Sequence, residues 1–247
     1  MRLTRFLIII TILGVLSAIP ATAQITLQGG VGLGLAMPSG DYGGSTIEYY
    51  QGTKYGLSSG INVHAKARVG ALGMRLMGEV GYSRLSNSGE AEPGQGKVEV
   101  KHTILSAKVG PEYSFSLPFA PFSVYLGGQV GINVIGGEST FQGVSKLSSG
   151  TYDIPSETRI GLGGSVGMIF SLGPGMNLDV AARYDAVNLL GKSWNDPNPL
   201  DDARLDSYRS VNDDRDPLFR AGDDKHFIAN SRSISTVHLT VTLMFGL

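Results

Sequence analysis

The sequence contains no cysteine among its 247 residues. This absence excludes a fold held together by disulfides and a zinc site with thiolate ligands. Charge is scarce and balanced, with 20 Lys and Arg against 21 Asp and Glu, which argues against nucleic acid as a partner. Beyond residue 23, no unbroken apolar stretch reaches the roughly 18 residues that indicate a transmembrane helix.

The first 23 residues have a composition of their own. Arg2 and Arg5 precede an apolar run over residues 6–16, and residues 21–23, Ala-Thr-Ala, form the small-residue pattern that a signal peptidase cleaves. A retained anchor helix is the alternative, but the run is shorter than the roughly 20 residues that span a bilayer. We therefore predict a signal peptide over residues 1–23 and one all-β domain over residues 24–247.

Glycine is abundant, with 35 residues, and much of it lies in stretches where apolar residues alternate with small or polar ones. This period of two is typical of β-strands. The last stretch, "STVHLTVTLMFGL", places its valines, leucines and phenylalanine on one face and its threonines and histidine on the other. Eight such strands are predicted, at residues 25–37, 57–69, 74–82, 103–115, 122–134, 160–170, 176–186 and 235–247.

The connections between these strands alternate in length. Short turns rich in Gly and Pro are predicted at residues 70–73, 116–121 and 171–175. Long polar loops are predicted at residues 38–56, 86–97, 136–157 and 187–232. Alternation of this kind is expected when short turns and long loops lie at opposite ends of one sheet.

The distribution of charge decides which face of each strand is outside. A soluble sandwich or a lipocalin-like barrel would carry its charges outside and its apolar residues inside. Here the apolar faces carry almost no charge over about ten residues, the height of a tilted membrane crossing, and the polar faces are crowded with Gly, Ser and Ala. The pattern predicts an all-β, eight-stranded, antiparallel, up-and-down transmembrane β-barrel, closed so that no backbone is left unpaired in lipid.

The signal segment, the eight strands, the alternating connections and the ending "LTVTLMFGL" together resemble the small outer-membrane β-barrel family, which includes the OmpA membrane domain and OmpX. The resemblance implies an integral protein of the outer membrane of a Gram-negative bacterium, in contact with outer-membrane lipid. It also implies that the barrel-assembly machinery reads the C-terminal strand. That family usually ends on an aromatic residue, whereas here Leu247 ends the chain and Phe245 lies two residues earlier.

The polar faces predict a charged network in the lumen. An eight-stranded barrel is just wide enough for its own side chains, so a salt-bridged plug is favoured, because buried charges must be paired. A narrow, weakly anion-preferring channel is the alternative. The predicted lumen residues are His64, Lys66, Arg68, Arg75, Glu79, Lys108, Glu112, Arg159, Asp179, Arg183 and Asp185.

Aromatic residues on the apolar faces lie near the strand ends, as the girdles at the two membrane interfaces of such barrels do. We predict interface positions for Tyr82, Tyr113, Phe115, Phe122, Phe170, Tyr184 and Phe245.

Residues 191–227 are rich in Asp and Arg and carry the aromatic residues Trp194, Tyr208 and Phe219, which we predict to recognise an extracellular ligand or partner. A divalent cation could bind the carboxylates, but the twelve-residue calcium-loop pattern is absent, so no metal and no cofactor is predicted. For catalysis, the candidates are His102 with Ser106 and His226 with Asp223 and Asp224. Neither spacing is specific, so we expect no enzyme; a lipid-modifying or proteolytic enzyme is the last alternative.

Overall fold

The computed structural model describes residues 25–116, 120–195, 203–221, 228 and 230–246. The signal peptide predicted over residues 1–23 and the terminal Leu247 lie outside the described residues. Both therefore stay predictions.

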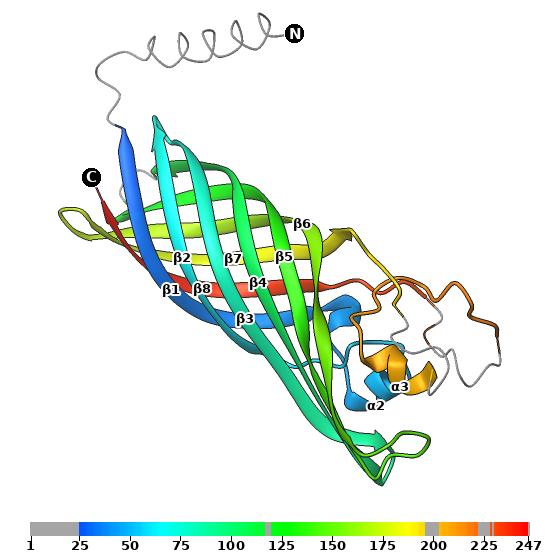
Figure 1. Ribbon diagram of the computed structural model, residues 1–247. Helices are drawn as coiled ribbons and strands as arrows, with labels where there is room; N and C mark the ends of the chain where they lie inside the picture. The colour runs from blue at the N-terminus through cyan, green and yellow to red at the C-terminus, as the bar shows by residue number, and fades with distance from the viewer. Residues whose placement is uncertain (1–24, 117–119, 196–202, 222–227, 229, 247) are drawn as a thin grey trace, which may run out of the picture.

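Within the described residues, eight antiparallel strands form one closed barrel in which each strand pairs with the next and β8 pairs with β1 (Figure 1). The strands are β1 (Thr26–Ser39), β2 (Gly60–Ala71), β3 (Met74–Glu92), β4 (Gln95–Ser116), β5 (Phe122–Gln142), β6 (Gly150–Gly173), β7 (Met176–Leu190) and β8 (Ser235–Gly246). The predicted fold class is confirmed. The pairing of β8 with β1 closes the barrel, because an open sheet would leave backbone groups unpaired in lipid.

The two ends of the barrel differ. The start of β1 and the end of β8 lie at the same end as the short turns, and the helices lie at the other end (Figure 1). In barrels of this kind the short turns face the periplasm, so the helical end is extracellular. In the described part of the chain, no helix has the length and hydropathy needed to cross a bilayer.

The outer wall of the membrane-embedded part is apolar, as predicted. Its side chains alternate with buried polar or small ones along every strand. On β2, for example, Ile61, Val63 and Val69 are exposed, whereas Lys66 and Arg68 are buried. The exposed apolar faces therefore require lipid around them, and the charged faces line the lumen.

Four strands continue well beyond the membrane, which corrects two predicted loops. Residues 86–97 were expected to form a loop, but β3 and β4 pair up to Glu92 and Gln95, so that only a tight turn remains. Most of residues 136–157 likewise belongs to β5 and β6, which leave a connection over residues 143–149. In these extensions the apolar residues face inward and the polar residues face outward. Leu85 and Val100 point inward and are buried, whereas Arg84 and Ser86 point outward. Outside the membrane the outer face of the strands contacts water instead of lipid, so the apolar residues lie on the inner face.

An aromatic core fills the extracellular end of the barrel, where the first and fourth loops fold over it. The first loop forms η1 (Gly40–Tyr42) and α2 (Thr46–Tyr50), and the fourth contains α3 (Ala203–Tyr208). A capping box between Ser45 and Glu48 starts α2. We call this assembly the cap; its largest buried residues are Tyr42, Tyr49, Tyr50, Tyr55, Phe141 and Tyr208.

A charge on the outer wall tests this arrangement. Val130 points toward lipid from the middle of β5, whereas Thr151 points outward from β6 beyond the membrane. We expect Val130→Arg to lower the free energy of unfolding by about 2–4 kcal/mol, because the charge must enter hydrocarbon. Thr151→Arg should change it by less than about 0.5 kcal/mol. Equal effects in urea titrations of the protein refolded in bilayers would contradict the assignment of the lipid-facing wall.

Candidate functional site

The lumen near the short turns contains a compact ion-pair cluster. Arg68 Nη2 and Lys66 Nζ lie 2.8 and 3.1 Å from Asp179 Oδ2, and Lys66 Nζ also lies 3.1 Å from Glu112 Oε1. The Nε of Arg68 donates to Glu112. Tyr125 donates to Asp179 Oδ1 at 2.9 Å, and its ring lies under the Arg68 guanidinium at 4.6 Å. Paired charges from β2, β4 and β7 and an aromatic ring from β5 thus meet inside the barrel at this level.

A second cluster lies nearer the middle of the barrel. Asp185 Oδ2 accepts from Lys108 Nζ at 2.6 Å and from Arg183 Nε at 2.9 Å, and Arg183 Nη1 lies 2.5 Å from Glu79 Oε1. Gln129 donates to the other Asp185 oxygen at 3.0 Å. All of these side chains are buried. The two clusters contain most of the predicted lumen residues.

Glycine makes room for both clusters. A Cβ at position 163 would lie 2.2 Å from Asp185 Oδ1, and one at position 167 would lie 2.4 Å from the Tyr125 ring. Side chains at these two inward positions would displace the buried carboxylate or the ring. The high glycine content of the polar faces therefore follows from the narrow lumen.

Three predicted lumen residues lie outside the two clusters. His64 bridges Asn62 Oδ1 and Thr242 Oγ1 at 2.9 and 2.8 Å. Arg75 is half-buried near the short turns, and its Nη1 has no hydrogen-bond partner among the described residues. Arg159 faces inward at the extracellular rim, where it pairs with the fourth loop. Its side chain is inward and buried as predicted, but it contacts the cap instead of the two clusters.

Sequence reasoning missed a Ser-His-Asp arrangement in the lumen. Ser83 Oγ lies 3.3 Å from His238 Nε2, and His238 Nδ1 lies 3.2 Å from Asp185 Oδ2. In hydrolases such an arrangement activates the serine. Here Ser83 is buried, and the void beside Asp185 measures about 10 Å³, room for one water molecule at most. Asp185 is also neutralised by two cations. The arrangement is therefore suited to packing rather than to turnover.

Asp213 fastens the fourth loop to the barrel rim. It is fully buried and accepts hydrogen bonds from Arg159 Nη2 at 2.8 Å, Arg159 Nε at 2.9 Å, Asn188 Nδ2 at 2.8 Å and the Ser193 backbone at 3.0 Å. Burial alone would raise the pKa of Asp213, but these donors hold that pKa below its usual range. Asp213 is therefore a buried structural residue of the cap and not a solvated loop carboxylate.

His102 lies inside the cap and not beside Ser106, the partner considered for catalysis. Its ring packs against Tyr42 and Tyr55 at centroid distances of 5.7 and 5.5 Å, and Arg232 lies 4.0 Å over the Tyr55 ring. Burial, assisted by the Arg232 charge, lowers the pKa of His102 to about 3. His226, Asp223 and Asp224, the other catalytic candidates, lie outside the described residues.

Acid should therefore loosen the cap. His102 binds a proton near pH 6.5 in the unfolded chain but only near pH 3 in the fold, so cap stability falls as the pH drops below 6.5. The expected loss is about 2 kcal/mol at pH 5. Trp194, the only tryptophan of the chain, lies in the fourth loop and can report the transition. The variant His102→Phe should unfold with the same urea midpoint at pH 7 and pH 5; an unchanged pH dependence would contradict this role.

The predicted recognition residues differ in their positions. Tyr208 is buried in the cap, with its ring tilted against those of Tyr49 and Phe141, and so it is a packing residue rather than an exposed anchor. Trp194 and Phe219 are half-buried. Leu218, which the sequence did not single out, is 67% exposed beside Phe219. Within the described residues, no group of three His, Cys, Asp or Glu could hold a metal ion; Asp196, Asp201 and Asp202 lie outside them.

The predicted interface aromatics all lie on the outer wall. Exposed examples include Tyr82, Tyr113, Phe115, Tyr184 and Phe245. Phe122 and Phe170 are half-buried against each other, with ring centroids 5.4 Å apart. Their role at the membrane interface stays a prediction.

These features are typical of one known protein family. The family model described as the outer membrane protein beta-barrel domain matches residues 8–205, well over half of the sequence. The chain belongs to this family. As an outer membrane β-barrel, it is an integral protein of the outer membrane of a Gram-negative bacterium. No curated protein matches the sequence.

Solved outer membrane proteins are similar to this β-barrel at low identity. Neisserial surface protein A is 16% identical, with 90% of this chain and 97% of that chain covered and a TM-score of 0.47. A major outer membrane protein from Thermus thermophilus is also 16% identical, with coverages of 90% and 99% and a TM-score of 0.47. Ail, the attachment invasion locus protein of Yersinia pestis, is 13% identical, with coverages of 88% and 98% and a TM-score of 0.40.

Proposed function

We propose that the protein is a surface-interaction barrel, in which the membrane-embedded strands form a closed scaffold and the extracellular part carries recognition. The observation that supports this most is the wall formed by β3–β6 beyond the membrane. These strands have 19 to 24 residues, whereas a tilted crossing needs about 10. The additional length is folded, packed and presented to the outside.

The outer surface of this wall is polar and ordered. Lys101 Nζ lies 2.8 Å from both Glu99 Oε1 and Glu138 Oε1, and the hydroxyls of Thr140 and Thr151 lie 2.9 Å apart. Next to the wall, the cap holds the fourth loop through Asp213. Loops placed on a rigid scaffold are where binding residues concentrate.

Within the fourth loop, Leu218 and Phe219 are the residues that we propose as apolar anchors for a partner. Leu218 is 67% exposed, and the Arg215 guanidinium lies 6.0 Å from the centre of the Phe219 ring. Trp194, also in this loop, is half-buried. Exposed apolar and aromatic side chains beside arginine are typical of binding surfaces.

The double variant Leu218→Ala/Phe219→Ala tests this function in cells that display the protein. We expect adherence to immobilised proteins and polysaccharides, or aggregation of the cells, to weaken at least about thirtyfold, because two apolar anchors at about 1–2 kcal/mol each contribute about 2–4 kcal/mol together. The control is Leu72→Ala, which removes a leucine that is 80% exposed at the opposite end of the barrel. Adherence equal to the parent in the double variant, at equal surface display, would refute the proposal.

A narrow anion-preferring channel has weaker support. The buried Nη1 atoms of Arg68 and Arg75 have no hydrogen-bond partner among the described residues, so the lumen holds N–H donors without acceptors near the short turns. The two ion-pair clusters oppose this alternative, because an ion would have to separate buried pairs to pass. We expect no enzymatic activity, since Ser83 and His238 are buried in the packed lumen.

A further inference from the structure

The cap encloses a void that the function proposed above does not use. Its volume is about 10 Å³, which is room for one particle of the size of a water molecule. The void lies where the first and fourth loops meet the extended strands. The residues that line it are Tyr49 and Tyr55 from the first loop, His102 from β4, Ile154 from β6, and Ser207, Tyr208, Ser210, Val211 and Arg232 from the fourth loop. An occupant of this void therefore contacts both loops.

A buried cation lines the void. Arg232 is 5% exposed, and its guanidinium lies 4.0 Å from the centre of the Tyr55 ring. Its Nη2 donates to the backbone carbonyls of Val211 and Asn212, but its Nε has no hydrogen-bond partner among the described residues. A buried donor without an acceptor costs free energy. The Nε atom therefore favours an acceptor inside the void.

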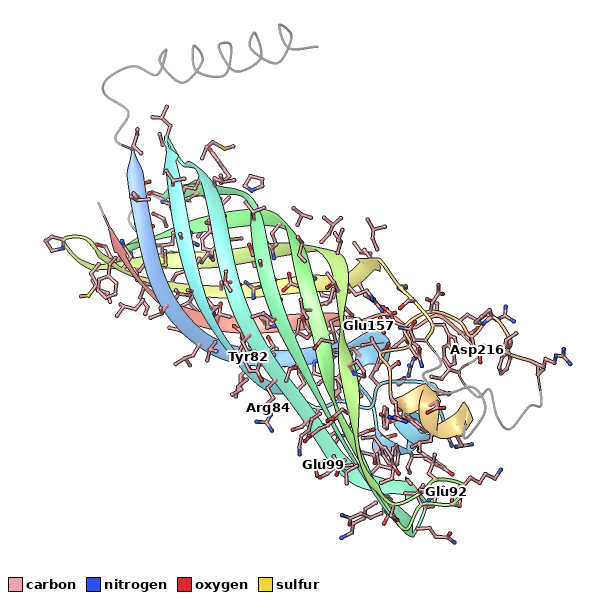
Figure 2. The ribbon with its side chains drawn as sticks, viewed as in Figure 1. Tyr82, Arg84, Glu92, Glu99, Glu157 and Asp216 are labelled. Carbon is pink, nitrogen blue, oxygen red and sulfur yellow. The ribbon has the colours of Figure 1, made fainter. Side chains whose placement is uncertain are left out.

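No carboxylate neutralises Arg232 in the part of the chain that the structure describes. None lies within ion-pairing distance of its guanidinium, and none lines the void. The Asp213 carboxylate is bound to Arg159, and only the Asp213 backbone carbonyl accepts from the Arg232 backbone. Glu157 and Asp216 also lie at this end of the barrel (Figure 2), but neither lines the void. Because a buried charge is costly unless it is paired, a negative ligand is favoured over water.

A second donor lines the same void. Tyr49 is 4% exposed, and its hydroxyl makes no hydrogen bond among the described residues, although Ser139 lies nearby. Burial raises the pKa of Tyr49 to about 12, so the hydroxyl is protonated at neutral pH and can donate. A guanidinium N–H and a phenol O–H thus border one small void. A monatomic anion accepts from both and donates to neither.

We propose that this void binds one chloride ion, held by Arg232 Nε and the Tyr49 hydroxyl. The size of the void excludes phosphate, sulfate and carboxylates. The bound ion neutralises Arg232 and joins the first loop to the fourth. Chloride in the medium then stabilises the cap, and with it the loop that carries Leu218 and Phe219.

The dependence of cap stability on chloride tests this proposal. Urea titrations of the refolded protein, followed by Trp194 fluorescence, are compared in sodium chloride and in sodium gluconate at equal ionic strength. We expect the urea midpoint of the cap to rise with chloride concentration and to stay constant in gluconate, because a ligand that binds only the folded state stabilises it. In crystals grown with bromide, we expect an anomalous scattering peak within hydrogen-bond distance of Arg232 Nε and the Tyr49 hydroxyl.

Two tyrosine variants separate chloride binding from packing. Tyr49→Phe removes one donor and keeps the ring, so the dissociation constant for chloride should rise at least about tenfold, the effect of losing a hydrogen bond to a charged group. The matched control is Tyr50→Phe, which removes a hydroxyl that donates to the Ser145 carbonyl at 2.8 Å and does not line the void. It should lower the urea midpoint and leave the dissociation constant for chloride unchanged. Arg232→Gln should abolish the chloride dependence.

The proposal is overturned if the urea midpoint is the same in chloride and in gluconate, or if the void contains only water and shows no bromide peak. It is also overturned if Tyr49→Phe and Tyr50→Phe change the dissociation constant for chloride equally. If the cap of Arg232→Gln does not fold, Tyr49→Phe decides, because its ring still packs against Phe141 and Tyr208.

Discussion

Replacing Asp213 by alanine is expected to detach the fourth loop from the barrel. Asp213 is fully buried and is the shared acceptor of Arg159, Asn188 and the Ser193 backbone. Its removal leaves the Arg159 guanidinium buried beside Glu157 alone. Breaking one partner of a buried ion pair costs about 3–5 kcal/mol. We expect the cap to lose stability by that amount while the eight strands stay folded.

Trypsin treatment of intact cells can measure this effect, because Arg215 and Arg220 lie in the same loop and are exposed. Cleavage of the Asp213→Ala protein should be faster than cleavage of the parent, and Trp194 fluorescence should change at a lower urea concentration. The matched control is Asp214→Ala, which removes the neighbouring exposed carboxylate. If both variants behave like the parent, Asp213 does not hold the loop.

An effect of the same size, but on the barrel itself, is expected from Asp179→Ala. Asp179 accepts from Lys66 at 3.1 Å, Arg68 at 2.8 Å and Tyr125 at 2.9 Å, and it is 1% exposed. Without it, two buried cations share only Glu112. We expect the free energy of unfolding in bilayers to fall by about 3–5 kcal/mol.

Asp153 provides the control for this variant. It lies on β6 beyond the membrane and is exposed, so Asp153→Ala should change the free energy of unfolding by less than about 0.5 kcal/mol. Urea titrations monitored by the heat-modifiable gel shift compare the two. Equal stability of both variants would mean that the lumen cluster tolerates unpaired charge, and that water or ions reach it.

The sequence predicted the barrel well where lipid is the outer solvent. There, apolar residues such as Val130 point outward and polar ones such as Gln129 point inward, which is the alternation expected of a membrane strand. Beyond the membrane the same strands carry the opposite pattern, with Val98 inside and Glu99 outside. Both patterns have a period of two, but only the first has the apolar outer face of a membrane strand, so the membrane pattern predicts a polar loop where the strands in fact continue.

The cap could not be predicted from the same pattern. Whether Asp213 is solvated or buried depends on Arg159 and Asn188, which lie 54 and 25 residues away in the sequence. The burial of Tyr208 likewise depends on Tyr49 and Phe141 from other segments. Tertiary contacts of this kind produce no periodic pattern in the sequence from which they could be predicted. The sequence predicted which charged residues face the lumen. Which of them pair with one another, and that His238 lies beside Ser83, follows only from the register of the strands in the barrel.

Planar-bilayer recording of the refolded protein tests most directly whether the barrel is a closed scaffold with its function outside. The ion-pair cluster of Lys66, Arg68, Glu112 and Asp179 and the cluster around Asp185 predict no discrete conductance from the parent protein. Steady channel events in the parent, with an anion preference that decreases when Arg68 or Lys108 is replaced by glutamine, would contradict the closed lumen and favour the channel.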